Sequence, residues 1–135
     1  MKKQKITERE WEARCDLAAC YHLCNYNGIS DRINTHISAR IPKKNDQFLL
    51  NPIGLLFDEI NATNLVSVYI SGTKVDANHP FDFNPAGYLI HSAVLEARPE
   101  IFCIIHHHSI AGIAIGTIAQ SYRIITGRER SILGE

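Results

Sequence analysis

The chain has 135 residues, of which 45% are hydrophobic and 21% are charged, and its formal net charge is zero. This length predicts a single domain over residues 1–135 with a substantial core, and the composition excludes both intrinsic disorder and the basic excess typical of nucleic-acid-binding proteins. Because the sequence has neither an apolar run long enough to span a membrane nor a signal-peptide pattern, we expect a cytoplasmic protein with no membrane partner.

The four cysteines lack the paired spacing of a zinc ribbon or of a small secreted disulfide framework. They stand at positions 15, 20, 24 and 103. Cys20 and Cys24 are four residues apart and are therefore neighbours on a helix, which leaves a metal site there as an alternative. A packed helix face is the favoured interpretation, and we expect the cysteines to be small buried hydrophobic side chains.

Caps, alternation and turn residues predict the elements of the first half of the chain. Thr7 and Glu10 have the spacing of a capping box, and Asn27-Gly28 is a typical helix end, so a helix is expected between them. The elements that follow are a strand at 34–41, a turn at 42–46, a returning strand at 47–50 and a tight turn at 51–54. These segments predict a β-hairpin after the first helix.

The second half of the chain has two further helix starts. Asn84 followed by Pro85 favours one, with Pro99 beyond its end, and Ser109 caps another. The expected elements are a short helical segment at 55–64, strands at 65–70 and from residue 73, a helix at 85–97, a buried strand at 101–105 and a helix at 110–119.

Three histidines, His106-His107-His108, directly follow the predicted strand at 101–105. Side chains alternate along a strand, so His106 and His108 are expected on one face and His107 on the other. Two neutral imidazoles can bind zinc, and a catalytic zinc site normally uses three protein ligands. The alternative is a solvated strand end, or a single ring that only forms a hydrogen bond in a core. His91 on the predicted helix is likewise open to two interpretations, as a ligand or base and as a core histidine.

Four segments taken together resemble the class II aldolase/adducin family over residues 7–120. They are Thr35-His-Ile-Ser-Ala-Arg40, Phe48-Leu-Leu-Asn-Pro-Ile-Gly-Leu-Leu56, Asn84-Pro-Ala-Gly-Tyr-Leu-Ile-His-Ser-Ala93 and Ala97-Arg-Pro-Glu-Ile-Phe-Cys-Ile-Ile-His-His-His-Ser109. The resemblance implies an α/β fold with three α/β/α layers around a mainly antiparallel sheet, and assembly as a homo-oligomer. It also implies zinc-dependent aldol cleavage of a small sugar or sugar phosphate.

The same resemblance assigns roles to individual residues. His106 and His108 match the zinc-binding pair, whose metal would polarise a substrate carbonyl and stabilise an enediolate. The residues that fall where the family builds its substrate or phosphate pocket are His36, Ser38, Asn51 and Gly54. His36 stands where the aldolases have asparagine, and Asn51 where they have threonine or serine.

Two departures from the aldolase pattern lead to alternative functions. Pro85, Ala86 and Gly87 replace the aldolases' paired serines and their glutamate acid/base, and glycine cannot transfer a proton. This replacement resembles the adducin-like branch, which implies a non-catalytic module for protein binding and assembly.

The other departure is the divergent segment 121–135, because family members continue further and carry their third metal histidine there. We therefore expect a shortened chain, in which His36, His79 or His91 is an alternative third ligand. An inactive shortened remnant is the third hypothesis beside the zinc-dependent lyase and the binding module.

Overall fold

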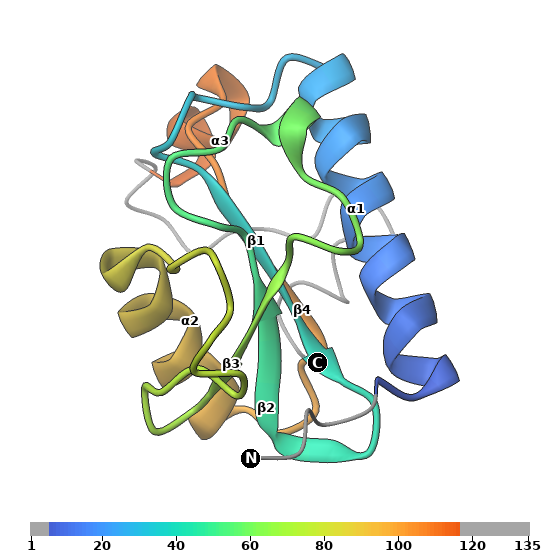
Figure 1. The fold of residues 1–135 in the computed structure, drawn as a ribbon. Helices are drawn as coiled ribbons and strands as arrows, with labels where there is room; N and C mark the ends of the chain where they lie inside the picture. The colour runs from blue at the N-terminus through green and yellow to red at the C-terminus, as the bar shows by residue number, and fades with distance from the viewer. Residues whose placement is uncertain (1–5, 117–135) are drawn as a thin grey trace.

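The computed structural model describes residues 6–116, and its ribbon is drawn in Figure 1. The elements in chain order are α1 (Glu8–Tyr26), β1 (His36–Ile41), β2 (Lys44–Leu50), the 3-10 helix η1 (Phe57–Glu59), β3 (Val66–Tyr69), α2 (Pro85–Ala97), β4 (Cys103–His106) and α3 (Ile110–Gly116). Within the described range, no helix combines the length and the apolar character that a membrane span requires.

The four strands form one sheet in the order β3-β2-β1-β4, and every neighbouring pair is antiparallel. The predicted hairpin of β1 and β2 is confirmed, with Lys43 in the left-handed region at φ 65° in its turn. β4 does not pair with β3, the strand before it in sequence, but with β1. This crossover sets His36 directly opposite His106, 70 positions later in the chain.

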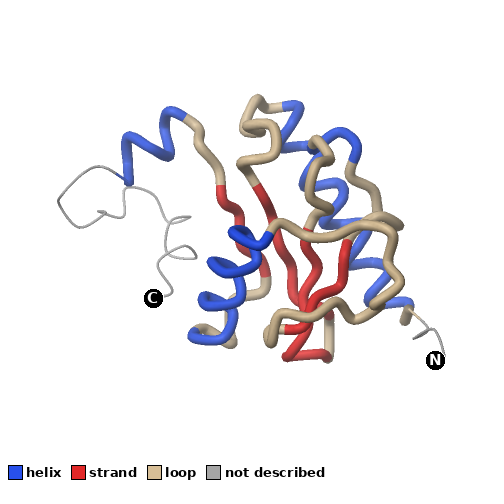
Figure 2. Tube along the Cα trace, turned by 60° about the vertical axis from the view of Figure 1, so that its left-hand side comes forward, coloured by secondary structure: helices blue, strands red, loops and turns tan. Residues whose placement is uncertain are grey.

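The sheet lies between helices, as Figures 1 and 2 show: α1 covers one face and α2 the other. The α1 face buries Leu17, Tyr21, Ile37, Ile41, Leu49, Phe57, Ile60 and Leu65, and the α2 face buries Phe48, Leu50, Val66, Val68 and Leu95. Alternate residues of each strand therefore serve opposite cores, as the pleat of a strand requires. The expected three-layer α/β/α architecture with an antiparallel sheet is confirmed.

Arg40 fixes where β4 begins. Its guanidinium donates to Ile101 O at 2.8 Å and to Asn45 O at 2.9 Å, and it also bonds to the carbonyl of Leu95 near the end of α2. The Arg40 backbone N–H donates to Phe102 O at 2.8 Å. Because the side chain is 8% exposed, these bonds form in a dry environment, where carbonyls without donors are costly. One residue of β1 thus holds both the end of α2 and the start of the histidine strand.

Two expectations about burial are wrong. The predicted buried strand at 101–105 is instead an edge strand of the described sheet, with Phe102 70% and Ile105 45% exposed. Of the cysteines only Cys24 is buried, whereas Cys15 and Cys103 are exposed and Cys20 is half-buried. In both cases the residue types favour a core. β4 is paired on one side only in the described sheet, which leaves part of its surface uncovered, and Cys15 lies on the exposed side of α1.

Several element boundaries also differ from expectation. The segment at 55–64 contains only one turn of 3-10 helix, and the strand expected from residue 73 is reduced to a single bridge between Val68 and Lys74. The Thr7 side chain accepts from Glu10 N at 3.2 Å, which is half of the predicted capping box. The Glu10 carboxylate bonds to Arg14 and Lys44 instead. Residues 117–119 of the last predicted helix lie outside the described residues.

Candidate metal centre

His106 and His108 lie together at the carboxyl end of β4. Their Nε2 atoms are 3.1 Å apart, and their rings are nearly perpendicular, with an interplanar angle of 84°. His107 points away toward α3, where its ring would meet a Cβ at Gly112 and its Nδ1 accepts from Ser109 N. The side chains of the three histidines therefore alternate as expected.

Asp31 contacts the second of these histidines. Its Oδ2 is 2.9 Å from His108 Nδ1, across 77 positions of sequence. Asp31 lies in the loop between α1 and β1, and the hydrogen bond with His108 lowers the pKa of its carboxyl. Burial and the two neighbouring imidazoles lower the pKa of His106, so this ring is neutral at pH 7 and can act as a metal ligand.

A second chain of polar side chains runs from the site into the α2 layer. His36 stacks on His106 with ring centroids 4.6 Å apart and planes 12° apart. Hydrogen bonds join His36 Nδ1 to His91 Nε2 at 2.8 Å and His91 Nδ1 to Ser38 Oγ at 2.5 Å. Burial, followed by the nearby imidazoles, lowers the pKa of His36 to about 4 and that of His91 to about 3. Both rings are therefore neutral hydrogen-bonding groups at pH 7.

The absence of a side chain at Gly87 leaves room for the His36 ring. A Cβ at Gly87 would lie 3.0 Å from the Cγ and Cδ2 atoms of the His36 ring and 3.2 Å from its Nδ1. The imidazole thus fills space beside the helix position at which the resemblance to class II aldolases implies a glutamate. His36 and Gly87, which both differ from the residues that the aldolase pattern implies, are therefore sterically coupled.

The four expected substrate-binding residues do not share one face. His36 and Ser38 lie in the α2 layer beside the histidine pair, whereas the buried Asn51 accepts a hydrogen bond from Tyr21 Oη at 2.9 Å in the α1 layer. The reason is register, because Asn51 follows Leu50, whose side chain packs toward α2. Gly54 occupies an exposed turn at φ 88°, with nothing within 4 Å of where a Cβ would be.

The two imidazoles fit a shared metal ion. Ligand nitrogens about 2.0–2.1 Å from one tetrahedral ion are separated by about 3.3 Å, close to the 3.1 Å between the two Nε2 atoms. Over residues 6–116, no three His, Cys, Asp or Glu side chains form a group that could hold a metal. His91 cannot complete the set because His36 and Ser38 occupy both its ring nitrogens, and His79 bonds instead in its own loop to Phe81.

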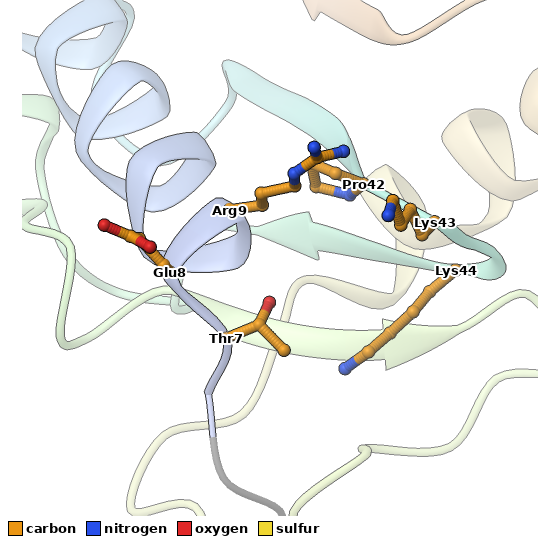
Figure 3. Close-up of a pocket in the computed structure, with 6 residues that line it drawn as sticks. All are labelled: Thr7, Glu8, Arg9, Pro42, Lys43 and Lys44. Carbon is orange, nitrogen blue, oxygen red and sulfur yellow. The ribbon is translucent and has the colours of Figure 1, made fainter.

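A surface pocket lies at the other end of β1, away from these histidines. Figure 3 shows its lining residues, Thr7, Glu8, Arg9, Pro42, Lys43 and Lys44, at the start of α1 and in the β1–β2 turn. Lys44 is already paired with Glu10 at 3.0 Å. The pocket therefore belongs to the hairpin turn and has no part in the candidate site.

Acidification below about pH 6.5 is expected to destabilise the fold. The folded-state pKa values of His36 and His91 lie below the ordinary 6.5, so the unfolded chain binds more protons between pH 6.5 and about 4. Stability present above pH 6.5 is therefore lost as the pH falls, at about 1 kcal/mol per pH unit, mostly from the fully buried His91. Denaturant unfolding at pH 7, 6 and 5 measures this slope.

The variant His91→Gln provides the control, because an amide can keep both hydrogen bonds without titrating in this range. Its unfolding free energy should fall less steeply between pH 7 and pH 5. An equal slope in the variant and the wild type would contradict the assignment to His91.

Sequence reasoning missed two parts of this site. Asp31 stands in a polar loop with no motif around it, so only its spatial position marks it. The contact between His36 and Gly87 had a signal, because both residues depart from the aldolase pattern in the same chain, but the sequence did not show that they touch.

Comparison with known proteins identifies the family. The model of the class II aldolase and adducin N-terminal domain matches residues 15–133. A Pseudomonas aeruginosa protein with the provisional name aldolase class 2 protein is 50% identical over 111 residues, which are 82% of this chain and 42% of that protein. Alpha-adducin of Mus musculus is 42% identical over 106 residues, 78% of this chain and 14% of the adducin.

Solved structures agree with the fold. An aldolase II superfamily protein from Pseudomonas syringae has a TM-score of 0.82 at 42% identity, with 96% of this chain and 52% of that chain covered. L-fuculose 1-phosphate aldolase from Glaciozyma antarctica PI12 has a TM-score of 0.80 at 26% identity, covering 100% of this chain and 55% of the aldolase. The chain thus spans about half the length of its relatives of known structure, and it belongs to the class II aldolase and adducin family.

Proposed function

We propose that this chain carries the metal-binding part of a class II aldolase-type lyase that cleaves a small sugar or sugar phosphate. The observation that carries the proposal is the pair of Nε2 atoms of His106 and His108, 3.1 Å apart. A zinc ion bound by this pair would supply Lewis-acid polarisation of a substrate carbonyl. Cytoplasmic location and assembly as a homo-oligomer belong to the same proposal.

His36 is proposed to orient the substrate beside the metal-binding pair. Its Nδ1 is fixed by His91, and no described residue bonds to its Nε2, which leaves that atom for a substrate hydroxyl. Because the pKa of His36 is about 4, the ring is a hydrogen-bonding group at pH 7 and a weak base. Ser38 supports this arrangement through its bond with His91.

The turn after β2 is proposed to receive the polar end of the substrate. Gly54 exposes backbone with open space around it, which suits close approach of a phosphate or a hydroxyl group. Asn51 holds this turn from inside, through Tyr21 and through a 3.3 Å bond from its Nδ2 to Pro52 O. Its proposed contribution to substrate binding is therefore indirect.

A non-catalytic adducin-like module for protein binding and assembly is the second candidate. Gly87 favours it, because this position offers no carboxyl group for proton transfer. The 42% identity to alpha-adducin over 106 residues supports the same branch. A stable oligomer that neither retains metal nor cleaves sugar phosphates would favour this candidate, and a chain that cannot fold cooperatively would favour an inactive remnant.

Metal content is expected to be about one zinc per chain in purified protein, measured by elemental analysis before and after mild chelation. The double variant His106→Ala/His108→Ala should lose it, because it removes both nitrogen ligands. His79→Ala is the matched control and should keep the metal, since His79 bonds only within its own loop. A folded wild-type chain without metal would rule out the zinc-dependent reaction, whereas bound zinc would justify screening sugar phosphates for aldol cleavage.

A further inference from the structure

We infer that Asp31 is a positioning residue that fixes the orientation and tautomer of the His108 ring. The inference rests on the proposed metal site for its functional meaning, but the contact itself is independent of any ion. Asp31 Oδ2 lies 2.9 Å from His108 Nδ1. A carboxylate only accepts hydrogen bonds, so this contact places the proton of the neutral ring on Nδ1. Nε2 then keeps its lone pair, facing His106.

The orientation of His108 needs such a partner because the ring is exposed. The His108 side chain is 40% exposed and stands beyond the last residue of β4, where no ladder hydrogen bond holds it. Its Nε2 is the atom nearest to His106 Nε2, so rotation of the ring would break the pair. Partners of this kind raise the basicity of metal-binding imidazoles and hold their rings in place.

Two hydrogen bonds of the Asp31 backbone help to order the loop that carries it. Asp31 N donates to Thr35 Oγ1 at 3.1 Å, and Asn34 N donates to Asp31 O at 2.9 Å. Arg32 between them has a positive φ of 48°, which completes the tight turn. Changing the side chain of residue 31 therefore keeps these two backbone bonds, while it removes the contact with His108 and the side-chain bond between the Asp31 carboxyl and Asn34.

Asp31→Asn and Asp31→Ala separate the two proposed effects of the carboxylate on the His108 ring, its tautomer and its orientation. The amide of asparagine can turn its NH₂ toward Nδ1 and stabilise the opposite tautomer, with the proton on Nε2, while alanine leaves the ring unheld. We expect both variants to bind zinc about 10–100-fold more weakly than the wild type. Asp16→Asn makes the same chemical change at an exposed position of α1 and should bind zinc as the wild type does.

Two measurements on the full chain test the inference. Competition between the protein and a chromogenic chelator for zinc gives the dissociation constants of the wild type and the three variants. Ring ¹⁵N chemical shifts of His108 in the metal-free protein report which nitrogen carries the proton. We expect a proton on Nδ1 in the wild type and in Asp16→Asn, a larger share on Nε2 in Asp31→Asn, and a mixture of tautomers in Asp31→Ala.

The outcomes separate this inference from the proposed function. Unchanged ¹⁵N shifts in both Asp31 variants would overturn the positioning role, even if the wild type binds zinc. Unchanged zinc affinity beside altered shifts would overturn its relevance to the metal. A wild type that binds no zinc would overturn the proposed reaction, while the ¹⁵N shifts would still decide whether Asp31 sets the His108 tautomer.

Discussion

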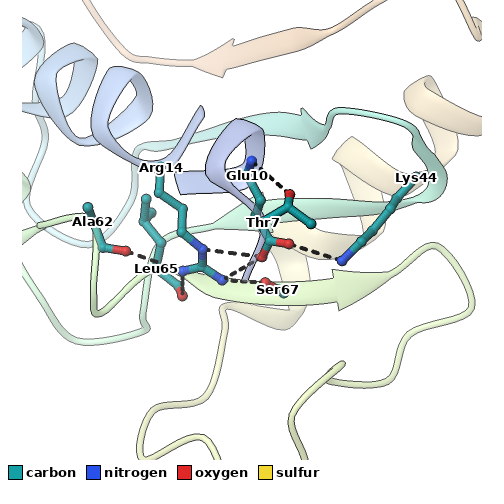
Figure 4. Close-up of polar contacts among 7 residues, drawn as sticks. All are labelled: Thr7, Glu10, Arg14, Lys44, Ala62, Leu65 and Ser67. Atoms are coloured by element: carbon teal, nitrogen blue, oxygen red, sulfur yellow. Dashed lines mark hydrogen bonds and ion pairs between the residues drawn. The ribbon is translucent and has the colours of Figure 1, made fainter. Parts of the chain in front are cut away.

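Arg14→Ala is expected to lower the free energy of unfolding by about 3–5 kcal/mol, the cost of breaking a buried ion pair by removing one partner. Figure 4 shows the network around this residue. Arg14 donates to Glu10 Oε1 at 3.3 Å, to Leu65 O at 2.8 Å and to Ser67 Oγ at 2.5 Å, and it is only 5% exposed. The substitution leaves a buried carboxylate paired only with Lys44 and buried oxygens without their donor.

The comparison that isolates this effect is Arg9→Ala, five residues earlier at an exposed position of α1. A surface change of that kind should alter the unfolding free energy by no more than about 0.5 kcal/mol. Urea unfolding monitored by circular dichroism measures both variants. A loss below about 1 kcal/mol for Arg14→Ala would mean that the network does not link α1 to β3 as the distances indicate.

Gly87→Ala is expected to destabilise the protein by about 1–3 kcal/mol, the usual cost of overpacking. The sign of this change in unfolding free energy is informative, because replacing glycine by alanine within a helix normally stabilises a protein by about 1 kcal/mol. Here the new methyl group would lie 3.0 Å from the His36 ring. The ring cannot easily yield, since it stacks on His106 and bonds to His91.

A double-mutant cycle with His36→Ala assigns this cost to the ring. In the His36→Ala background the space beside position 87 is open, so Gly87→Ala should there be neutral or stabilising. We expect a coupling energy of about 2 kcal/mol between the two positions. Equal effects of Gly87→Ala in both backgrounds would show that the loss arises within α2 and would contradict the steric link between His36 and position 87.

Local sequence patterns predict the parts of the fold that depend on interactions between neighbouring residues. The cap at Thr7, the Asn84-Pro85 helix start and the β1–β2 hairpin all follow from short-range rules about backbone hydrogen bonds and turns. The alternation of His106, His107 and His108 follows equally from strand geometry. Four dispersed segments were enough to indicate the family, which the comparisons confirm.

Which of these residues meet depends on contacts between segments that are distant in the sequence. Pairing of β4 with β1 sets His36 against His106, and the loop before β1 brings Asp31 to His108. Strand register sends Asn51 to the α1 layer, although it lies close in sequence to residues of the α2 layer. β4 is more exposed than its residue types indicate, because exposure depends on which elements cover the edge of the sheet. Local rules act over a few residues, whereas strand order and layer packing are set by contacts between distant segments, and the candidate site is made of such contacts.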